Sequence, residues 1–263
     1  MVSGRRALPA TLCGFALLGW GAFIFGAEGT SLPGICAASP LADRPAAWLD
    51  LAMALGLPTK LALCWALMIA AMMPPLVLEP LRHLRDRSLA RRRGRATTLF
   101  AVGYAAVWMT AGAALQTLAL ACRLAAPDAW APLLAGFAAA VLWQVSPAKQ
   151  ICLNACHRRP PLAAFGWAAE RDALLFGITH ALWCVGACWA LMLLPLLVGQ
   201  GHLLVMAGVG IFLLGERLER PATPAWRSRG PRKALRIVAA QLRIRLDAAG
   251  LPARVAARAS EPA

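Results

Sequence analysis

Six apolar stretches in this 263-residue chain approach the length of a membrane-spanning helix. A bilayer crossing needs about 20 apolar residues, and these stretches cover about residues 8–27, 59–79, 98–121, 131–146, 173–198 and 201–215. The fourth and the sixth are near the lower length limit. Composition agrees, because 60% of the residues are hydrophobic and 15% are charged. The sequence therefore predicts an all-α fold, a polytopic membrane helix bundle with about six transmembrane helices.

Positive charge gathers in alternate connections between these stretches. Of the 27 Lys and Arg residues, 24 lie before the first stretch, between the second and third, between the fourth and fifth, or after the sixth. The other connections hold Arg44, Lys60 and Arg123. Since connections rich in Lys and Arg stay in the cytoplasm, we expect both termini there. The net charge of +15 would suit a nucleic-acid binder, but the apolar bulk argues against one.

The apolar stretches and the basic residues divide the chain into two parts of unequal length. We expect residues 1–220 to form the six-span transmembrane domain and residues 221–263 a basic cytoplasmic tail. Arg5 and Arg6 precede the first stretch as in a secretory signal, but a poor cleavage site after it favours an uncleaved anchor. Residues 233–249 predict an amphipathic helix whose apolar stripe is Leu235, Val238, Leu242 and Leu246. Such a helix would bind anionic lipids of the inner leaflet; the alternative is a solvated charged tail.

Sulfur-containing side chains recur at the spacing that places residues on one helix face, four residues apart. The spacing occurs in three segments: Cys64, Met68 and Met72; Cys152 and Cys156; and His180, Cys184, Cys188 and Met192. Cys and Met are the soft ligands that select Cu(I), and zinc to a lesser degree. Zinc prefers closed Cys/His sites, so the methionines favour Cu(I). The competing interpretation is that these side chains only pack.

These residues form the predicted metal site. We expect Cys64, Met68, Met72, His180, Cys184, Cys188 and Met192 to face each other inside the membrane, and Cys152 with Cys156 to form a cytoplasmic docking pair. A Cu(I) ion would pass between successive ligands. The chain has no Gly-x-x-x-x-Gly-Lys-Ser/Thr motif for ATP, so transport would be passive, gradient-coupled or dependent on a partner.

One short segment occurs twice. Cys-Trp-Ala-Leu-Met spans Cys64 to Met68 and again Cys188 to Met192, in stretches predicted to run in opposite directions. An inverted 3+3 repeat, common in transporters with a site at the repeat interface, explains this; coincidence in an Ala/Leu-rich chain is the alternative. At about 1.5 Å rise per residue, Met68 reaches the depth of Cys188. We therefore expect the second and fifth stretches to be neighbours.

Three motifs between about residues 60 and 217 resemble the DUF2182 family, bacterial integral membrane proteins of unknown function that are described as predicted metal-binding. The first motif matches Trp65, Met68, Ala71, Met72 and Met73; the second matches Gln144, Pro147, Lys149, Cys152 and Cys156; the third matches Cys184, Gly186, Cys188, Trp189, Leu191 and Met192. Glu216 and Arg217 resemble the Glu-Lys that closes the last span of the family. The resemblance implies a metal-binding protein of the bacterial inner membrane.

The chain departs from the family pattern at several positions. Trp143 stands where the family has Tyr, and Ala187 stands where a second, paired Cys is expected. His180 and His202 stand where Gly and Asn are expected, and Gly201 replaces a Met. If a metal is bound, imidazole has partly replaced sulfur in this chain.

Two other function classes compete with copper binding. A membrane thiol-disulfide oxidoreductase would use Cys152 with Cys156, or Cys184 with Cys188, although neither pair has the usual Cys-x-x-Cys spacing. A structural or assembly subunit would use these side chains only for packing. No carboxylate pair or Ser/His/Asp set lies within the apolar stretches, so we do not expect an enzyme of the hydrolytic kind. A metal chaperone or another membrane subunit is the expected partner; nothing in the sequence indicates the oligomeric state.

The distribution of basic residues generates a topology prediction. Reporter proteins fused at Ala47 and at Ala263 should report the outer and the cytoplasmic compartment respectively, because the connection around Ala47 is poor in Lys and Arg. Enzymatic reporters that are active on one side of the membrane measure this. Signals from the same compartment at both positions would contradict the predicted topology.

Overall fold

Helices make up all the regular structure of the described part of the chain. The computed structural model describes residues 3–25, 57–126, 130–198, 201–228 and 230–248. Its elements are α1 (Ser3–Phe25), α4 (Leu57–Met72), α5 (Pro74–Arg87), η3 (Ala90–Arg92), α6 (Arg93–Ala125), α7 (Ala131–Val145), α8 (Pro147–Cys156), α9 (Gly166–Leu197), α10 (His202–Arg217) and α11 (Arg232–Ala248). The all-α prediction is confirmed for these residues.

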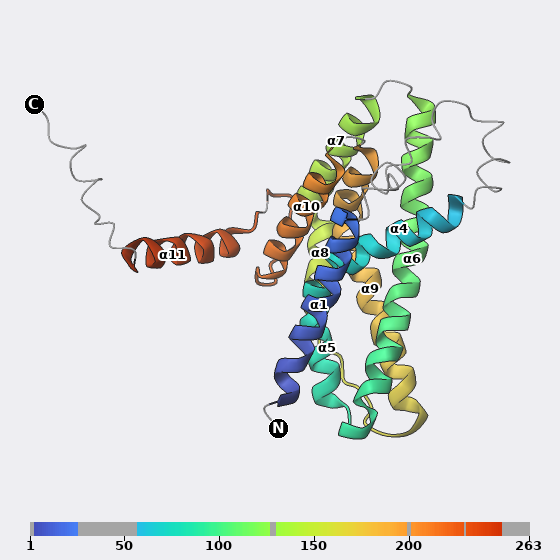
Figure 1. Ribbon diagram of the computed structural model, residues 1–263, viewed down its shortest axis with the longest axis vertical. Helices are drawn as coiled ribbons and strands as arrows, with labels where there is room; N and C mark the ends of the chain where they lie inside the picture. The colour runs from blue at the N-terminus through green and yellow to red at the C-terminus, as the bar shows by residue number, and fades with distance from the viewer. Residues whose placement is uncertain (1–2, 26–56, 127–129, 199–200, 229, 249–263) are drawn as a thin grey trace, which may run out of the picture.

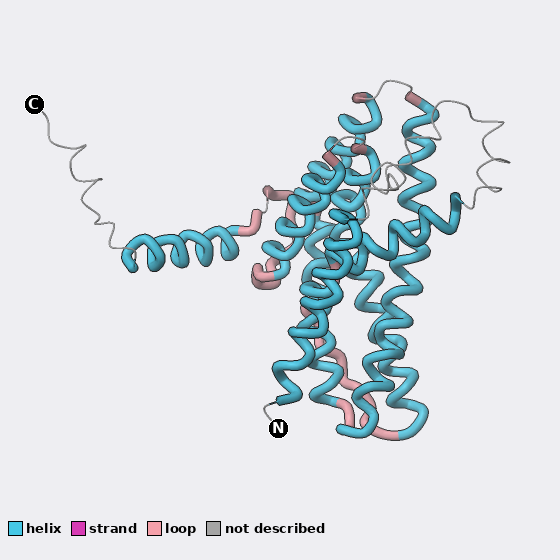
Figure 2. Tube along the Cα trace, in the orientation of Figure 1, coloured by secondary structure: helices cyan, strands magenta, loops and turns pink. Residues whose placement is uncertain are grey.

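The long helices α1, α6 and α9 lie along one axis of the molecule (Figures 1 and 2). Helices α1, α6 and α9 start at the end that holds the N-terminus and run away from it, whereas α7, α8 and α10 run back (Figure 1). Helices α6 and α9 are therefore parallel neighbours at the centre. This arrangement places the carboxyl ends of α8 and α10 beside the middle of α9.

Three helices are long and apolar enough to cross a membrane, or up to five spans if each of two bent helix pairs counts as one. The three are the segments Leu8–Phe25, Ala90–Ala125 and Gly166–Leu197. The predicted number of six is not confirmed. One reason is α10, which has 16 residues, fewer than the about 20 that a crossing needs.

The other reason is that the second and fourth apolar stretches are broken. Helices α4 and α5 meet at 69°, and α7 and α8 meet at 68°. Proline has no N–H to continue helical hydrogen bonding, so Pro74 ends α4 at Met72. Pro147 likewise favours extended backbone at Ser146, whose ψ is 147° and whose hydroxyl caps α8 at the Lys149 N–H.

The 3+3 repeat is not confirmed either. The Cys-Trp-Ala-Leu-Met segment of α4 leads into a break at Pro74, whereas the matching segment of α9 continues in the helix past Pro195. The two copies therefore occupy helices of different shape.

Glycines let the central helices approach at backbone distance. A Cβ atom at Gly177 of α9 would lie 2.2 Å from the Phe100 carbonyl oxygen of α6, and one at Gly103 would lie 2.7 Å from the Leu174 oxygen. Small residues at helix interfaces are typical of membrane bundles, where close packing rather than water exclusion joins the helices. The pairing of α6 with α9 depends on these two positions.

Large apolar side chains cover the outside of the bundle, among them Phe15, Leu18, Leu134, Phe137, Leu204 and Ile211. Leu204 is 80% exposed and Leu18 is 73% exposed. Soluble monomers rarely expose a continuous apolar surface of this kind, whereas lipid solvates it well. The outer surface is compatible with a membrane protein.

The predicted amphipathic helix is present as α11, which extends sideways from the bundle near the level where α10 ends (Figure 1). Its apolar residues remain uncovered, since Leu235, Val238 and Leu242 are each more than half exposed. The segment before it packs on the bundle: Asn154 Nδ2 donates to the Ala222 oxygen at 2.8 Å. Thus residues just after position 220 contact α8.

Replacing Gly177 by Ala should destabilise the bundle by about 1–3 kcal/mol, because the added methyl group meets backbone that cannot move without separating α6 from α9. Thermal unfolding of the detergent-solubilised protein measures the effect. Gly208→Ala is the control, since nothing lies within 4 Å of a Cβ at that helical position. It should leave stability unchanged or slightly raised. Equal effects of both substitutions would contradict the close α6–α9 contact.

Candidate functional site

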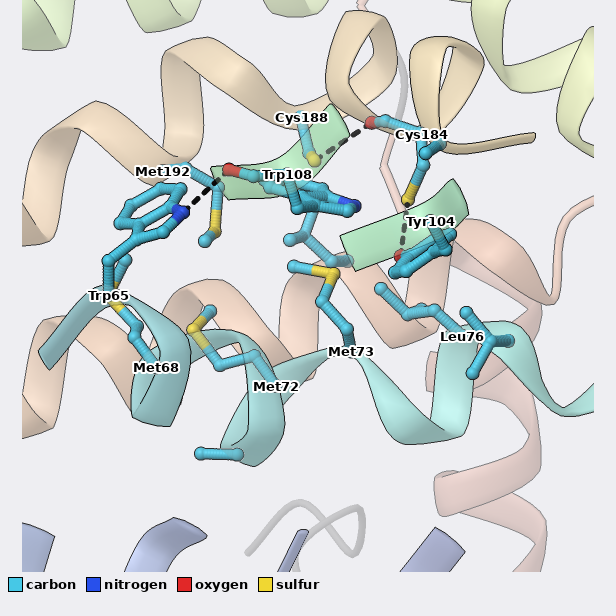
Figure 3. Packing of buried hydrophobic residues seen from close by; sticks show 14 of the residues in the cluster. Trp65, Met68, Met72, Met73, Leu76, Tyr104, Trp108, Cys184, Cys188 and Met192 are labelled. Carbon is cyan, nitrogen blue, oxygen red and sulfur yellow. Dashed lines mark hydrogen bonds between the residues drawn. The ribbon is translucent and has the colours of Figure 1, made fainter. Parts of the chain in front are cut away.

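Six buried sulfur atoms from two helices and one helix break face a common region of the core (Figure 3). We call this set the sulfur cluster; it consists of Met68, Met72, Met73, Cys184, Cys188 and Met192. None of the six side chains is more than 3% exposed. Met68 and Cys188 both belong to it, but the expected direct pairing of the second and fifth stretches is not shown, because α4 packs on α1, α6 and α5.

The break after α4 brings the methionines into position. Met68 and Met72 lie one turn apart on α4, and the chain turns at Met73, which adds a third thioether (Figure 3). Trp65 ties α4 to α6, because its indole N–H donates to the Trp108 carbonyl oxygen at 2.7 Å. Gly112 leaves room for that indole: a Cβ there would lie 2.0 Å from Trp65 Nε1.

Cys184 is the most strongly hydrogen-bonded thiol of the cluster. The Arg217 guanidinium donates to its Sγ at 3.0 Å, and the Tyr104 hydroxyl lies 3.4 Å from the same atom. Cys188 Sγ donates to the Cys184 carbonyl oxygen at 2.9 Å. A guanidinium only donates and stays charged, and Arg217 is half-buried. Its position on the sulfur favours the thiolate form of Cys184.

Helix α8 brings two more thiols to α9. Cys152 Sγ packs on the backbone of Gly186, where a Cβ would lie 2.7 Å from the sulfur. Cys156 is buried and interacts with the Arg217 guanidinium and with Cys184. The pair predicted as a separate docking site therefore lies against the Cys184 and Cys188 segment, because the bend at Ser146 turns α8 toward α9.

A buried ion pair connects α8 with the end of α10. Lys149 Nζ lies 2.7 Å from Glu216 Oε2, and their side chains are only 3% and 6% exposed. Gln144 completes the network, since its amide donates to Glu216 and its carbonyl accepts from Lys149. Glu216 directly precedes Arg217, so this network sets the position of the guanidinium that contacts Cys184.

His180 and Cys64 occupy different surroundings from the rest of the predicted ligands. The His180 ring lies 6.0–6.2 Å from the rings of Phe100, Tyr104 and Phe176. Its Nε2 is buried and has no hydrogen-bond partner among the described residues. Cys64 is disulfide-bonded, and its partner lies outside the described residues. In that oxidised form Cys64 offers no thiolate.

The available donors suit a soft monovalent ion. Within the described part of the chain, no group of three or more His, Cys, Asp or Glu side chains is close enough to hold a metal ion. A closed Cys/His zinc site is therefore not formed there. Thioethers and thiolates, both of which line this region, are the soft ligands that select Cu(I).

Residues 62–236 match the PpoB2 family, which is described as a copper chaperone. The match covers well over half of the chain. The chain belongs to the PpoB2 copper chaperone family. No curated protein and no solved structure matches it.

Membership in the PpoB2 family agrees with the sequence-based expectation of copper handling. The matched range contains every predicted ligand from Cys64 to Met192, and it also includes α10 with Glu216 and Arg217. The match shows a copper-related family and does not identify the chain as a member of DUF2182.

The predicted ligand set left out several residues that the structure places beside the sulfur cluster, although Met73, Lys149, Glu216 and Arg217 stood in the matched motifs. Tyr104 and Arg217 contact Cys184, Met73 adds a sulfur, and Lys149 pairs with Glu216. A signal for the charged residues was present, because ionisable groups next to apolar stretches are costly and tend to be functional. Nothing in the spacing indicated which of them pair.

Replacing Lys149 by Met should lower the free energy of unfolding by about 3–5 kcal/mol, because it leaves the Glu216 carboxylate buried without its partner. The double variant K149M/E216Q removes both charges and should recover much of this loss. Denaturant unfolding in detergent measures all three proteins.

Arg82→Met serves as the control, since the Arg82–Glu79 pair has side chains that are 45% and 62% exposed. Exposed pairs contribute about 0–1 kcal/mol. A loss in K149M no larger than that in R82M would show that the buried pair does not hold α8 to α10.

Proposed function

We propose that this protein is a multi-pass protein of the bacterial inner membrane that binds Cu(I) in the sulfur cluster and carries it to a partner. The observation that supports this most strongly is the convergence of six buried Cys and Met side chains in a chain of a copper chaperone family. The proposed ligands are Met68, Met72, Met192, Cys184 and Cys188, with Cys152, Cys156 and His180 at the thiol end.

The charges around the cluster fit a monovalent ion. Cu(I) bound to the Cys184 thiolate forms a neutral unit, which lowers the cost of holding an ion in an apolar region. In the metal-free protein the Arg217 guanidinium neutralises the same sulfur at 3.0 Å. Cu(I) and Arg217 therefore compete for Cys184, so the guanidinium has to separate from the sulfur when copper binds.

Helices α4 and α9 offer Cu(I) ligands of different strength along one row. The thiols of Cys184 and Cys188 lie toward the α10 end that holds Arg217, and the thioethers of Met68, Met72 and Met192 continue from them (Figure 3). Thioethers are neutral and bind Cu(I) more weakly than thiolates do. An ion can thus move between neighbouring ligands, as release to a partner requires.

Partners are proposed from the charge of the surface. We propose that both termini are cytoplasmic and that α11 lies on anionic lipids, because its apolar side chains are exposed and Arg236, Arg243 and Arg245 flank them. A soluble metal chaperone or a second membrane subunit would receive or supply the copper.

A thiol-disulfide oxidoreductase is the second candidate. It is favoured by the proximity of Cys152 and Cys156 to the Cys184 segment, which brings four reduced thiols to two adjacent helices. An oxidoreductase needs thiol pairs but no methionines, so the two functions make different demands on the cluster.

The double variant C184S/C188S should bind Cu(I) at least about tenfold more weakly than the parent, a difference of about 1.4 kcal/mol. Serine nearly preserves the side-chain volume but is a poor ligand for a soft ion. Competition with a chromophoric Cu(I) chelator under anaerobic, reducing conditions measures the affinity. C13S/C122S is the control, because Cys13 is exposed and Cys122 lies outside the sulfur cluster.

Equal copper affinity in C184S/C188S, C13S/C122S and the parent would contradict the proposal. Reversible formation of a disulfide by Cys152, Cys156, Cys184 or Cys188 without metal, together with no copper binding, would favour the oxidoreductase.

A further inference from the structure

His202 is a buried imidazole with one nitrogen bonded and the other without a partner. It begins α10 and is 1% exposed. Its Nδ1 lies 2.8 Å from the Pro195 carbonyl oxygen. A carbonyl only accepts, so Nδ1 carries the proton and the Nε2 lone pair of the neutral ring is free. That Nε2 is buried and has no hydrogen-bond partner among the described residues.

An unpartnered buried acceptor is destabilising, so Nε2 of His202 is a candidate ligand atom. The same tautomer is the one found in metal-binding histidines, whose second nitrogen donates to a backbone carbonyl and thereby orients the ring. The hydrogen bond to Pro195 thus prepares Nε2 to bind a cation.

Thioethers lie on the same side of α10. Met206 follows His202 by one helical turn and is fully buried. One turn further along, the Met72 methyl carbon lies 3.7 Å from the Cβ position of Gly210, so the Met72 side chain reaches the same face of α10. On α9, Met192 lies about one turn before Pro195. Pro195 is the residue whose carbonyl oxygen accepts the hydrogen bond from His202.

The site is closed toward α1. The Phe23 ring lies 6.2 Å from the His202 ring, and Phe23 is completely buried. Among the described residues, no Asp or Glu takes part in the contacts of His202. The donors in this region are therefore neutral nitrogen and sulfur atoms, which favour Cu(I) over divalent ions.

We propose a second Cu(I) position at the end of the cluster remote from Arg217, with His202 Nε2 and Met206 as its ligands beside Met72. The inference rests on the proposed function and extends it. Without a thiolate, this position holds the ion more weakly than Cys184 does. It is the place where the ion enters or leaves the row of ligands, and Met72 and Met192 connect it with the thiols.

His202→Asn tests the proposal with little change in structure, because the Asn amide can still donate to the Pro195 oxygen while Nε2 is lost. Met206→Leu removes the second ligand at nearly constant volume. Met109→Leu is the matched control, since Met109 lies outside the sulfur cluster. His180→Asn removes the imidazole near the opposite end of the row and so distinguishes the two possible nitrogen donors.

The probe is Cu(I) alone, added anaerobically to the full-length protein in detergent. We expect H202N and M206L each to weaken the less tightly bound Cu(I) by about tenfold or more, while M109L leaves it unchanged. X-ray absorption at the copper edge should show a nitrogen contribution that H202N reduces, whether or not His180 is also replaced. Thermal unfolding verifies that each variant is folded. If H202N does not fold, the copper affinity of M206L tests the proposal.

Parent-like copper affinity in both H202N and M206L would overturn the proposal, as would a nitrogen neighbour that only H180N removes. The double variant C184S/C188S separates this failure from failure of the proposed function. If C184S/C188S binds Cu(I) weakly while H202N and M206L behave as the parent, copper binding at the thiols stands and the second position does not exist.

Discussion

The buried ion pair between Lys149 and Glu216 holds the candidate site together. It joins the short helix α8 to the last turn of α10, at a depth where an unpaired charge would be strongly destabilising. Because Arg217 follows Glu216 directly, the same contact places a guanidinium on Cys184. Cys156, the last residue of α8, lies close to the same guanidinium. The pair therefore fixes α8 relative to α10, while the Cys152 thiol of α8 packs directly on Gly186 of α9.

The two helix breaks serve the site in the same way. A break inside an apolar region leaves backbone groups that must find partners within the protein. At Ser146 the hydroxyl caps α8, and at Met73 the chain turns and contributes a third thioether. Broken helices next to buried polar groups are typical of membrane proteins that move ions. Here the breaks point the soft ligands of α4 and α8 toward the unbroken α9.

Several features were predictable from the sequence. Long apolar stretches and low charge content indicated a helical bundle, and the spacing of four between Cys and Met placed them on common faces of α4 and α9, as the buried Met68, Met72, Cys184 and Cys188 confirm. The number of spans was not predictable in this way, because hydropathy does not register that Pro74 and Pro147 break helices. The repeated Cys-Trp-Ala-Leu-Met segment was also a weak guide to an internal repeat. Its first copy leads into the helix break at Pro74, whereas the second continues in α9 past Pro195.

The sequence by itself therefore determined the helical class, the copper-type donors and the face of each helix on which they lie, because these depend on composition and on a helical period that is local. Only the tertiary structure decided which faces meet. Close approach at Gly103 and Gly177 pairs α6 with α9, Trp65 ties α4 to α6, and Lys149 with Glu216 brings α8 to α10. Such contacts join residues far apart in the chain, so no local pattern could show that Arg217 lies on Cys184 or that Met72 of α4 reaches α10 at Gly210.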